Sequence, residues 1–149
     1  MESVRAMLTS DSAGYSGTPL SKKLGIRTGS RLFAKNPPEN YLELVSPLPA
    51  GVSILKRISS KLDIIHFFTK SQTELRENIG DFSKRIKQDG MIWVSWPKKA
   101  LKVATDMTED VIREVVLPLG LVDVKVCAVD EIWSGLKIVI RKELRKTDI

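Results

Sequence analysis

The segment Trp96-Pro97-Lys98-Lys99 combines side chains that can hold an anion. Two ammonium groups supply positive charge, and the indole supplies a flat apolar face. The segment ends the apolar run IWVSW, so it lies where a buried strand reaches solvent. Two interpretations follow: a ligand-binding site at the strand end, or a tryptophan that covers the sheet beside two solvated lysines.

Asn36 and Pro37 follow another short apolar run, RLFAK, and form a second candidate binding site. In an open α/β sheet, ligands bind at the carboxyl ends of the parallel strands, which is where this turn would lie. A structural role accounts for the same residues. Asn36 can cap a helix whose first turn holds Pro37 and Pro38, with Glu39 completing a capping box.

His66 is the only histidine of the chain and lies within the apolar run IIHFFT. A histidine in a buried strand is more often a hydrogen-bonded core residue than a catalytic base. No nucleophile motif stands beside it. The sequence therefore argues against a histidine-based metal site and against a catalytic triad, and we predict no metal.

Trp133 lies in the turn segment DEIWSG, between two strands of alternating polarity. A tryptophan on a turn can mark a contact with a partner protein or a lid. It can equally fold back onto the sheet, so Trp133 is a candidate partner contact with a structural alternative.

Two other features have simple explanations. The AGYSGTP turn with Lys22 and Lys23 can receive an anion at a helix N-terminus, but its spacing is not that of a Walker loop and a capping turn explains it. Asp106, Glu109 and Asp110 lie at the start of a helix, where acids stabilise the positive end of the helix dipole.

The chain length predicts a single domain. At 149 residues it can bury a core without disulfides or a structural metal. Residues 1–13 show no hydrophobic period and read as a flexible tail, so we place the domain over residues 14–149. No run approaches the roughly 18 apolar residues of a membrane span. The lone Cys127, and an N-terminus without an apolar signal segment, favour the cytoplasm.

The net charge is positive but spread along the sequence. Lys and Arg number 24 against 18 Asp and Glu, a net charge of +6. The basic residues occur as scattered pairs among acids, whereas a nucleic-acid binder of this size more often carries one concentrated stripe. The pattern therefore argues against nucleic acid as the partner and favours a solvated surface.

Periodicity predicts an α/β fold. Apolar runs predict strands at RLFAK, VSILKRI, DIIHFFT and MIWVSW. Helices are expected over Pro19–Leu24, over Pro38–Val45, from a Ser71/Glu74 capping box to a point before Asp89-Gly90, and from Thr108 onward. In the last helix we expect five residues to face inward: Val111, Ile112, Val115, Val116 and Leu119. The runs LVDVKVCAV and LKIVIRK alternate in polarity and predict a terminal antiparallel hairpin. The expected architecture is a three-layer, Rossmann-like, mostly parallel sheet closed by that hairpin.

This order of elements resembles the S-adenosylmethionine-dependent methyltransferase fold, in which a hairpin supplies the antiparallel strand. The segments YSGTPLSKKLGI, WVSWPKK, ATDMTEDVIRE and GLVDVKVCAVDEIWSGLK resemble the DUF3052 family, an uncharacterised bacterial family. That resemblance runs from Tyr15 to Arg141. It implies a fold and a bacterial origin but no activity.

The chain departs from the methyltransferase pattern at two places. Those enzymes carry a glycine-rich turn after the first strand, so that backbone amides approach the cofactor. Here residues 35–39 read KNPPE, without glycine and with two prolines that lack amide donors. At the end of the second strand, Lys56 and Arg57 stand where an acid would hold a ribose. S-adenosylmethionine is therefore disfavoured as a cofactor.

Three functional hypotheses follow. The first is a non-catalytic binding or regulatory domain that receives a small anionic ligand or a protein partner near Asn36 and Trp96–Lys99. The second is an S-adenosylmethionine-dependent methyltransferase with an atypical cofactor mode. It predicts that four polar residues line one apolar pocket: Asn36, His66, Lys98 and Asp106. The third is a weak nucleic-acid binder with one continuous basic face.

Overall fold

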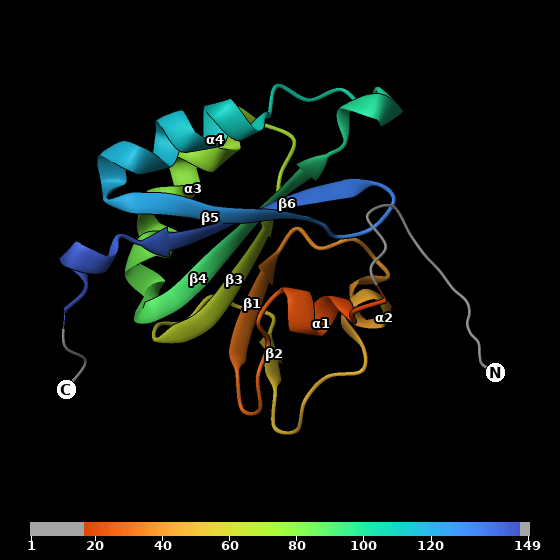
Figure 1. Cartoon of the computed structure of the whole chain (residues 1–149), viewed down its shortest axis with the longest axis vertical. Coiled ribbons are helices and arrows are strands. Elements are labelled where there is room, and N and C mark those ends of the chain that lie inside the picture. Colours follow the sequence, from red (N-terminus) through yellow and green to blue (C-terminus); the bar gives the residue numbers. More distant parts are fainter. Residues whose placement is uncertain (1–16, 147–149) are drawn as a thin grey trace.

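The computed structural model describes residues 17–146 of the 149-residue chain, so the tail predicted for residues 1–13 lies outside the described part. Six strands form one sheet in the spatial order β2-β1-β3-β4-β6-β5 (Figure 1). Their bounds are β1 Arg31–Lys35, β2 Ser53–Leu55, β3 Leu62–Phe68, β4 Ile86–Pro97, β5 Leu121–Ala128 and β6 Trp133–Ile140. β1 to β4 are parallel, and β6 pairs antiparallel with both β4 and β5. The predicted fold class is confirmed.

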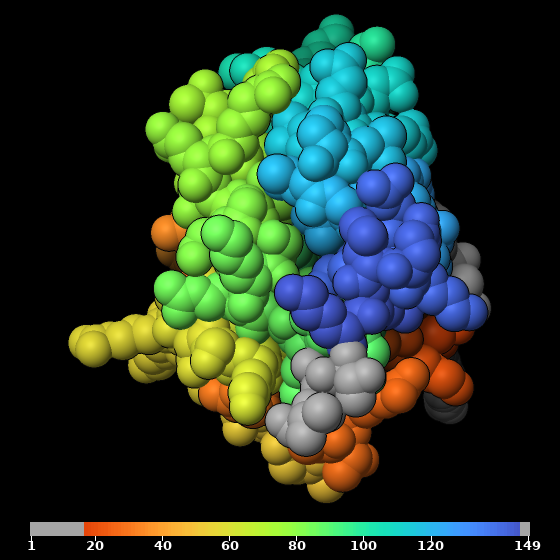
Figure 2. All heavy atoms as spheres, turned by 90° about the vertical axis from the view of Figure 1, so that its left-hand side faces the viewer, coloured from red at the N-terminus to blue at the C-terminus, as the bar shows by residue number. Residues whose placement is uncertain are grey.

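Helices cover both faces of this sheet, which makes three layers (Figure 1). Their bounds are α1 Leu20–Lys23, α2 Tyr41–Val45, α3 Gln72–Arg85 and α4 Glu109–Val116, with short 3-10 turns η1 Lys99–Leu101, η2 Leu117–Leu119 and η3 Lys142–Leu144. One core cluster lies between the sheet and α3 and α4, and a second lies between the sheet and α1 and α2. Figure 2 shows α3 and α4 side by side, with the blue segment that follows β6 next to them.

The two central strands are buried on both faces, as the apolar runs predict. In β3 only Asp63 is partly exposed, and the half of β4 from Ile92 to Pro97 is buried throughout. Such strands need no polar alternation because helices cover both sides. β4 begins at Ile86, five residues before the predicted start, because the chain passes directly from α3 into the strand.

The predicted role of Asn36 as a helix cap is wrong. α2 begins only at Tyr41, with Asn40 at the N-cap position, and the amide of Tyr41 donates to the carbonyl of Pro38 in a preceding turn. A residue before a proline avoids helical backbone angles, so Pro37 does not start a helix ahead of Pro38. Asn36 itself adopts a left-handed conformation with φ 55°.

The caps of the two longer helices follow the sequence prediction in part. The side chain of Ser71 accepts from the amide of Glu74, and that of Thr108 accepts from the amide of Val111. The reciprocal half of the predicted capping box is not made. The amide of Ser71 instead donates to the hydroxyl of Thr69.

The prediction that Leu119 faces inward is also wrong. α4 ends at Val116, and Leu119 lies in the following 3-10 turn with 47% of its side chain exposed. Pro118 removes a helical donor and so favours the end of the α-helix at this point. Among the described residues, no helix is long and apolar enough to cross a membrane.

Close packing around Gly90, which lies within β4, leads to a stability prediction. A Cβ there would lie 3.0 Å from the carbonyl oxygens of Leu62 and Lys87 and from the Cβ of Ile86. We expect Gly90→Ala to destabilise the protein by about 1 to 3 kcal/mol, as overpacking does. The matched control is Gly80→Ala inside α3, where a Cβ meets nothing within 4 Å and helix propensity adds up to about 1 kcal/mol. Urea unfolding measures both changes, and equal stability of the two variants would contradict the prediction.

Candidate functional site

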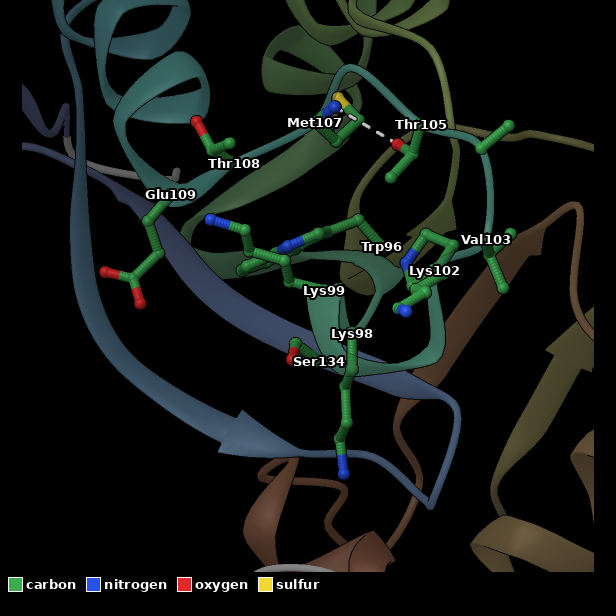
Figure 3. Close-up of a pocket in the computed structure, with 12 residues that line it drawn as sticks. Trp96, Lys98, Lys99, Lys102, Val103, Thr105, Met107, Thr108, Glu109 and Ser134 are labelled. Atoms are coloured by element: carbon green, nitrogen blue, oxygen red, sulfur yellow. Dashed lines mark hydrogen bonds between the residues drawn. The ribbon is translucent and has the colours of Figure 1, made fainter.

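A cavity of about 580 Å³ opens at the carboxyl end of β4 (Figure 3). Its walls combine apolar side chains with three lysines and one acid. The lining residues are Trp96, Pro97, Lys98, Lys99, Lys102, Val103, Ala104, Thr105, Met107, Thr108, Glu109 and Ser134. We call this the lysine pocket. It lies at the sheet edge where ligands bind in open α/β folds.

The hairpin fixes one side of the lysine pocket. Trp96 pairs with Ser134 across the β4–β6 ladder, and the amide of Lys98 donates to the carbonyl of Ile132 at 2.8 Å. The 3-10 turn η1 then reverses the chain and ends at Lys102, which has a left-handed φ of 55°. This turn presents three lysines within five residues.

The opposite side of the lysine pocket is tied to the loop after β3. The hydroxyl of Thr105 donates to the carbonyl of Lys70 at 2.7 Å and accepts from the amide of Met107 at 3.1 Å. A carboxylate oxygen of Asp106 accepts from the amide of Gln72 at 2.8 Å. Asp106 therefore holds two loops together and takes no part in lining the cavity.

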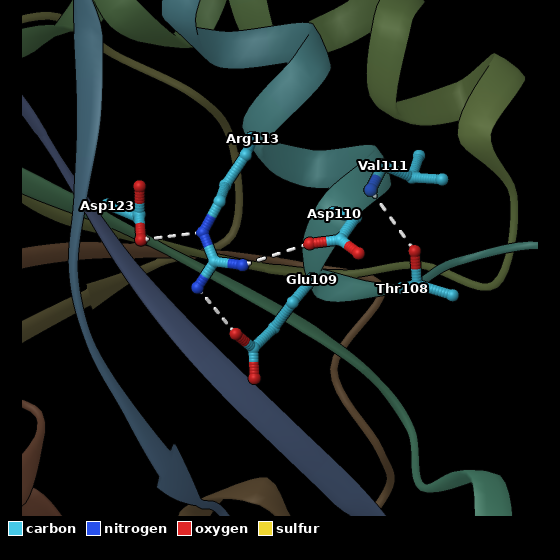
Figure 4. A network of polar contacts seen from close by, with 6 residues as sticks. All are labelled: Thr108, Glu109, Asp110, Val111, Arg113 and Asp123. Atoms are coloured by element: carbon cyan, nitrogen blue, oxygen red, sulfur yellow. Dashed lines mark hydrogen bonds and ion pairs between the residues drawn. The ribbon is translucent and has the colours of Figure 1, made fainter.

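The one acid in the lysine pocket is already paired. Three nitrogens of Arg113 each contact a different carboxylate (Figure 4). Its Nη2 lies 2.6 Å from Glu109, its Nη1 lies 3.1 Å from Asp110, and its Nε lies 2.9 Å from Asp123. The hydrogen bonds that Arg113 donates, first to Asp123 and then to Glu109, raise the pKa of Arg113 above its usual value. Arg113 shares one positive charge among three carboxylates, so Glu109 keeps negative charge, and the three lysines of the pocket outnumber this single acid.

Among the described residues, the three lysines have no acidic partner. In the described part of the chain, no carboxylate lies within 4.0 Å of the ammonium groups of Lys98, Lys99 or Lys102. Figure 3 shows Lys99 extending toward Thr108 and Glu109, whereas Lys98 points away from them. Of the two lysines predicted at this place, Lys99 is thus the better placed, and Lys102 joins it.

Asn36 lies in a different hollow. Its side-chain amide donates to the carbonyl of Phe68 at 3.1 Å and to the carboxylate of Glu74 at 3.0 Å, and Glu74 also accepts from the hydroxyl of Thr69. These residues border a cavity of about 350 Å³ together with Trp133. The network ties together the polar groups at the ends of β1 and β3, and the role of Asn36 in ligand binding stays a prediction.

Trp133 lies half buried over the end of the sheet. Its ring meets that of Phe68 edge-on, with centroids 5.1 Å apart, and its amide donates to the carboxylate of Asp130. The alternative in which Trp133 folds back onto the sheet therefore describes its position. A contact with a partner protein stays a prediction.

His66 is fully buried and borders neither the lysine pocket nor the hollow beside Asn36. Its Nδ1 lies 2.9 Å from the hydroxyl of Tyr41 and its Nε2 lies 2.8 Å from the hydroxyl of Ser95. A neutral imidazole can donate through one nitrogen and accept through the other, so both hydroxyls are satisfied. Desolvation lowers the pKa of His66 to about 3. His66 is thus a hydrogen-bonded core residue.

The four residues that the second hypothesis placed in one pocket are dispersed. Lys98 borders the lysine pocket, Asn36 borders the smaller hollow, His66 is enclosed in the core, and Asp106 bridges two loops. The structure thus brings together Trp96, Lys98 and Lys99, and separates them from the other candidates.

The turn after β1 does not fit an adenosyl cofactor held in the usual way. Pro37 and Pro38 occupy the turn and offer no amide donors, while Asn36 is tied to β3 and α3. A third hollow of about 480 Å³ lies between this turn and the end of β2. It is lined by Pro37, Pro38, Tyr41 and Leu42 among others, and it carries Lys56 where an acid would bind a ribose.

Comparisons with known proteins address the fold. No protein-family model and no curated protein matches the chain, so the resemblance to the DUF3052 family stays a prediction. Solved structures do match. The chain has a methyltransferase-like fold. Magnesium protoporphyrin IX methyltransferase from Synechocystis PCC 6803 with bound SAM matches at a TM-score of 0.58 and 11% identity, over 80% of this chain and 74% of that one.

Two further methyltransferase structures match similarly. The ribosomal protein L11 methylase of Lactobacillus delbrueckii subsp. bulgaricus has a TM-score of 0.54 and 10% identity, over 81% of this chain and 74% of that one. A SAM-dependent methyltransferase from Aquifex aeolicus has a TM-score of 0.54 and 12% identity, over 80% and 86%. At such identities these likenesses show the fold alone.

Sequence reasoning missed Lys102, Thr105 and Glu109 as pocket residues. Lys102 stands three residues after Lys99, and a turn in between would have placed both lysines at one opening. The proline at position 97 was the available signal, because it ends the strand and makes such a turn favourable.

The neutral state of His66 yields a pH prediction. The pKa of His66 is about 3 in the folded protein and about 6.5 in the unfolded chain. Between these two pH values only the unfolded chain binds a proton at this residue, so the free energy of unfolding falls as the pH drops from about 6.5 toward about 3. The largest slope from this one group is about 1.4 kcal/mol per pH unit. Urea unfolding at several pH values should show a smaller loss between pH 6.5 and 4.5 for His66→Gln than for the unchanged protein. Parallel pH profiles would contradict the prediction.

Proposed function

We propose that this chain is a non-catalytic, methyltransferase-like domain that binds a small anionic ligand in the lysine pocket. The observation that carries the proposal is a cavity at the carboxyl end of β4 that holds three lysines and one acid, and none of these lysines has a described carboxylate within 4.0 Å. Charge-assisted hydrogen bonds from ammonium groups to an anion are stronger than hydrogen bonds between neutral groups, so the lysines favour an anionic ligand.

The apolar wall of the pocket suggests that the ligand also has an apolar or aromatic part. Trp96, Val103 and Met107 line the pocket together with the lysines. A ligand that carries phosphate or carboxylate on a flat ring would match both surfaces. A protein partner is the less favoured alternative, because small molecules bind in concave cavities such as this one.

The absence of catalysis is proposed from the state of the ionisable groups. His66 is buried and already bonded at both ring nitrogens, and Glu109 is held by Arg113. A general base must reach the proton that it abstracts, and neither group is free to do so.

An atypical S-adenosylmethionine-dependent methyltransferase is the second candidate. The hollow of about 480 Å³ between the β1 turn and the end of β2 supports it, because it lies at the carboxyl edge of the sheet in a fold shared with methyltransferases. This candidate predicts binding of the adenosyl cofactor beside Pro37 and Lys56, away from the lysine pocket.

Calorimetric titration with ATP, pyrophosphate and S-adenosylhomocysteine separates these candidates. We expect ATP or pyrophosphate to bind, and Lys99→Gln/Lys102→Gln to weaken binding by about tenfold or more, since tenfold corresponds to about 1.4 kcal/mol. The charge-matched control is Lys84→Gln/Lys142→Gln, because both lysines lie at the opposite edge of the sheet and are exposed.

Three outcomes would count against the proposal. If Lys99→Gln/Lys102→Gln and Lys84→Gln/Lys142→Gln weakened binding equally, the anion would bind outside the lysine pocket. Binding of S-adenosylhomocysteine that survives Lys99→Gln/Lys102→Gln would support the methyltransferase candidate. No heat with either phosphate ligand would exclude phosphate-bearing anions as the ligand class.

A further inference from the structure

Five cationic side chains from separate segments gather on the side of the β5–β6 hairpin that faces α1. We call this group the basic face. It consists of Lys23 in α1, Arg27 after α1, Lys125 in β5, Lys137 in β6 and Arg145 after β6. None of the five borders the lysine pocket.

Strand register places the two central lysines. Lys137 pairs with Trp93 on one side and with Lys125 on the other, so the three side chains project to the same face of the sheet. The indole nitrogen of Trp93 donates to the carbonyl of Leu24 at 2.9 Å. The end of α1 therefore lies over this face, and Arg27 follows it three residues later.

The remaining cations flank this pair. Burial raises the pKa of the Cys127 thiol, and the positive charges of Lys23 and Lys125 oppose that rise, which places both cations near Cys127. Arg145 is held at the other end of β6, where its Nε donates to the carbonyl of Ile140 at 3.0 Å.

The cations repel one another. Desolvation lowers the pKa of Lys137, and the charges of Lys125, Arg27 and Arg145 lower it further. Like charges directly opposite each other on neighbouring strands are destabilising. Within residues 17–146, no carboxylate lies within 4.0 Å of these side chains to offset the repulsion.

Two of the three acids of the hairpin are directed elsewhere. Asp123 pairs with Ile138, which belongs to the core beneath α4, and its carboxylate binds Arg113 on that side. Asp130 is used at the hairpin tip, where it accepts from the amides of Ile132 and Trp133. The two sides of the hairpin therefore differ in charge.

We propose that the basic face binds the phosphate backbone of double-stranded nucleic acid without reading its sequence. Cations that are unpaired in the free protein gain most from a partner with closely spaced negative charges, and phosphate contacts need no base recognition. The face is formed by cations, and the ring of nearby Trp133 packs edge-on against Phe68, so a duplex backbone suits this face better than single strands, whose binding depends on stacking.

The chemistry of the face disfavours other polyanions. Protein interfaces depend on aromatic or aliphatic anchors, and membrane-surface binding depends on inserted apolar side chains. The apolar side chains that share this face of the hairpin are half buried: Val122, Cys127, Trp133 and Val139. Binding here would rest on charge alone.

The test is fluorescence anisotropy with a short labelled DNA duplex over a salt series from about 50 to about 200 mM. We expect measurable binding at the low end, with log K falling linearly with log salt. Lys125→Gln/Lys137→Gln should weaken binding about tenfold or more and reduce the magnitude of the salt slope by about 2. The same variant should melt at an equal or higher temperature, because a like-charge contact is removed.

Two control variants keep the test specific. Lys56→Gln/Arg57→Gln removes the same charge beyond β2, at the other edge of the sheet, and should leave binding nearly unchanged. Lys125→Arg/Lys137→Arg keeps the charge and should retain binding. If Lys125→Gln/Lys137→Gln fails to fold, Arg27→Gln in the exposed loop replaces it.

The outcomes against the proposal are distinct from those for the lysine pocket. Absence of duplex binding at low salt, or an equal loss in Lys56→Gln/Arg57→Gln, would overturn it. Binding to poly-glutamate or to phosphatidylserine vesicles without binding to the duplex would assign the face to an acidic protein or a lipid surface instead. Lys99→Gln/Lys102→Gln should leave duplex binding intact, so either proposal can fail alone.

Discussion

A neutral imidazole enclosed in the sheet is the constraint on which much of this molecule depends. His66 is completely buried in β3, and the hydroxyls of Tyr41 and Ser95 satisfy its two nitrogens. These two hydrogen bonds link α2, β3 and β4, and they form only when all three elements are in place. Aromatic contacts continue this linkage, because Tyr41 packs edge-on against Phe68 and Phe68 against Trp133. The hairpin tip is thereby coupled to the centre of the sheet.

The same packing decides where space remains at the carboxyl edge. Next to β1 and β3, Asn36, Thr69 and Glu74 bond to one another, and Trp133 covers the strand ends. Beside β4 the chain instead turns away through η1, and the segment up to α4 encloses a cavity. A fold shared with methyltransferases thus carries its open site next to β4 and has a proline turn where a cofactor-binding turn would lie.

Charge is distributed unevenly around this scaffold. Arg113 gathers three carboxylates from α4 and β5 on one side of the sheet. That arrangement leaves lysines in excess both around the cavity at the end of β4 and on the opposite side of the hairpin. An unpaired cation in water costs little, but cations held close together repel, and a negative partner relieves that repulsion. The net charge of +6 is therefore not spread evenly, because cations gather around the lysine pocket and on the basic face.

The sequence by itself determined the class of fold and the nature of its strands. The apolar runs around His66 and Trp93, the capping residues Ser71 and Thr108, and the alternation of the last two strands are local patterns, and the structure follows them. Local patterns also showed that the turn after β1 lacks glycine. The sequence could not show how long β4 would be, because an apolar period does not mark where a helix passes directly into a strand.

Tertiary structure decided which polar residues meet. Asn36 looked like a helix cap, yet its amide bonds to Phe68 and Glu74, more than thirty positions away. Lys102 became a pocket residue only because η1 turns the chain back. Basic residues scattered along the sequence came together as one face because strand register sets Lys125 opposite Lys137 and α1 packs over Trp93. Such contacts depend on pairing between distant segments, and the spacing of residues along one segment carries no information about that pairing.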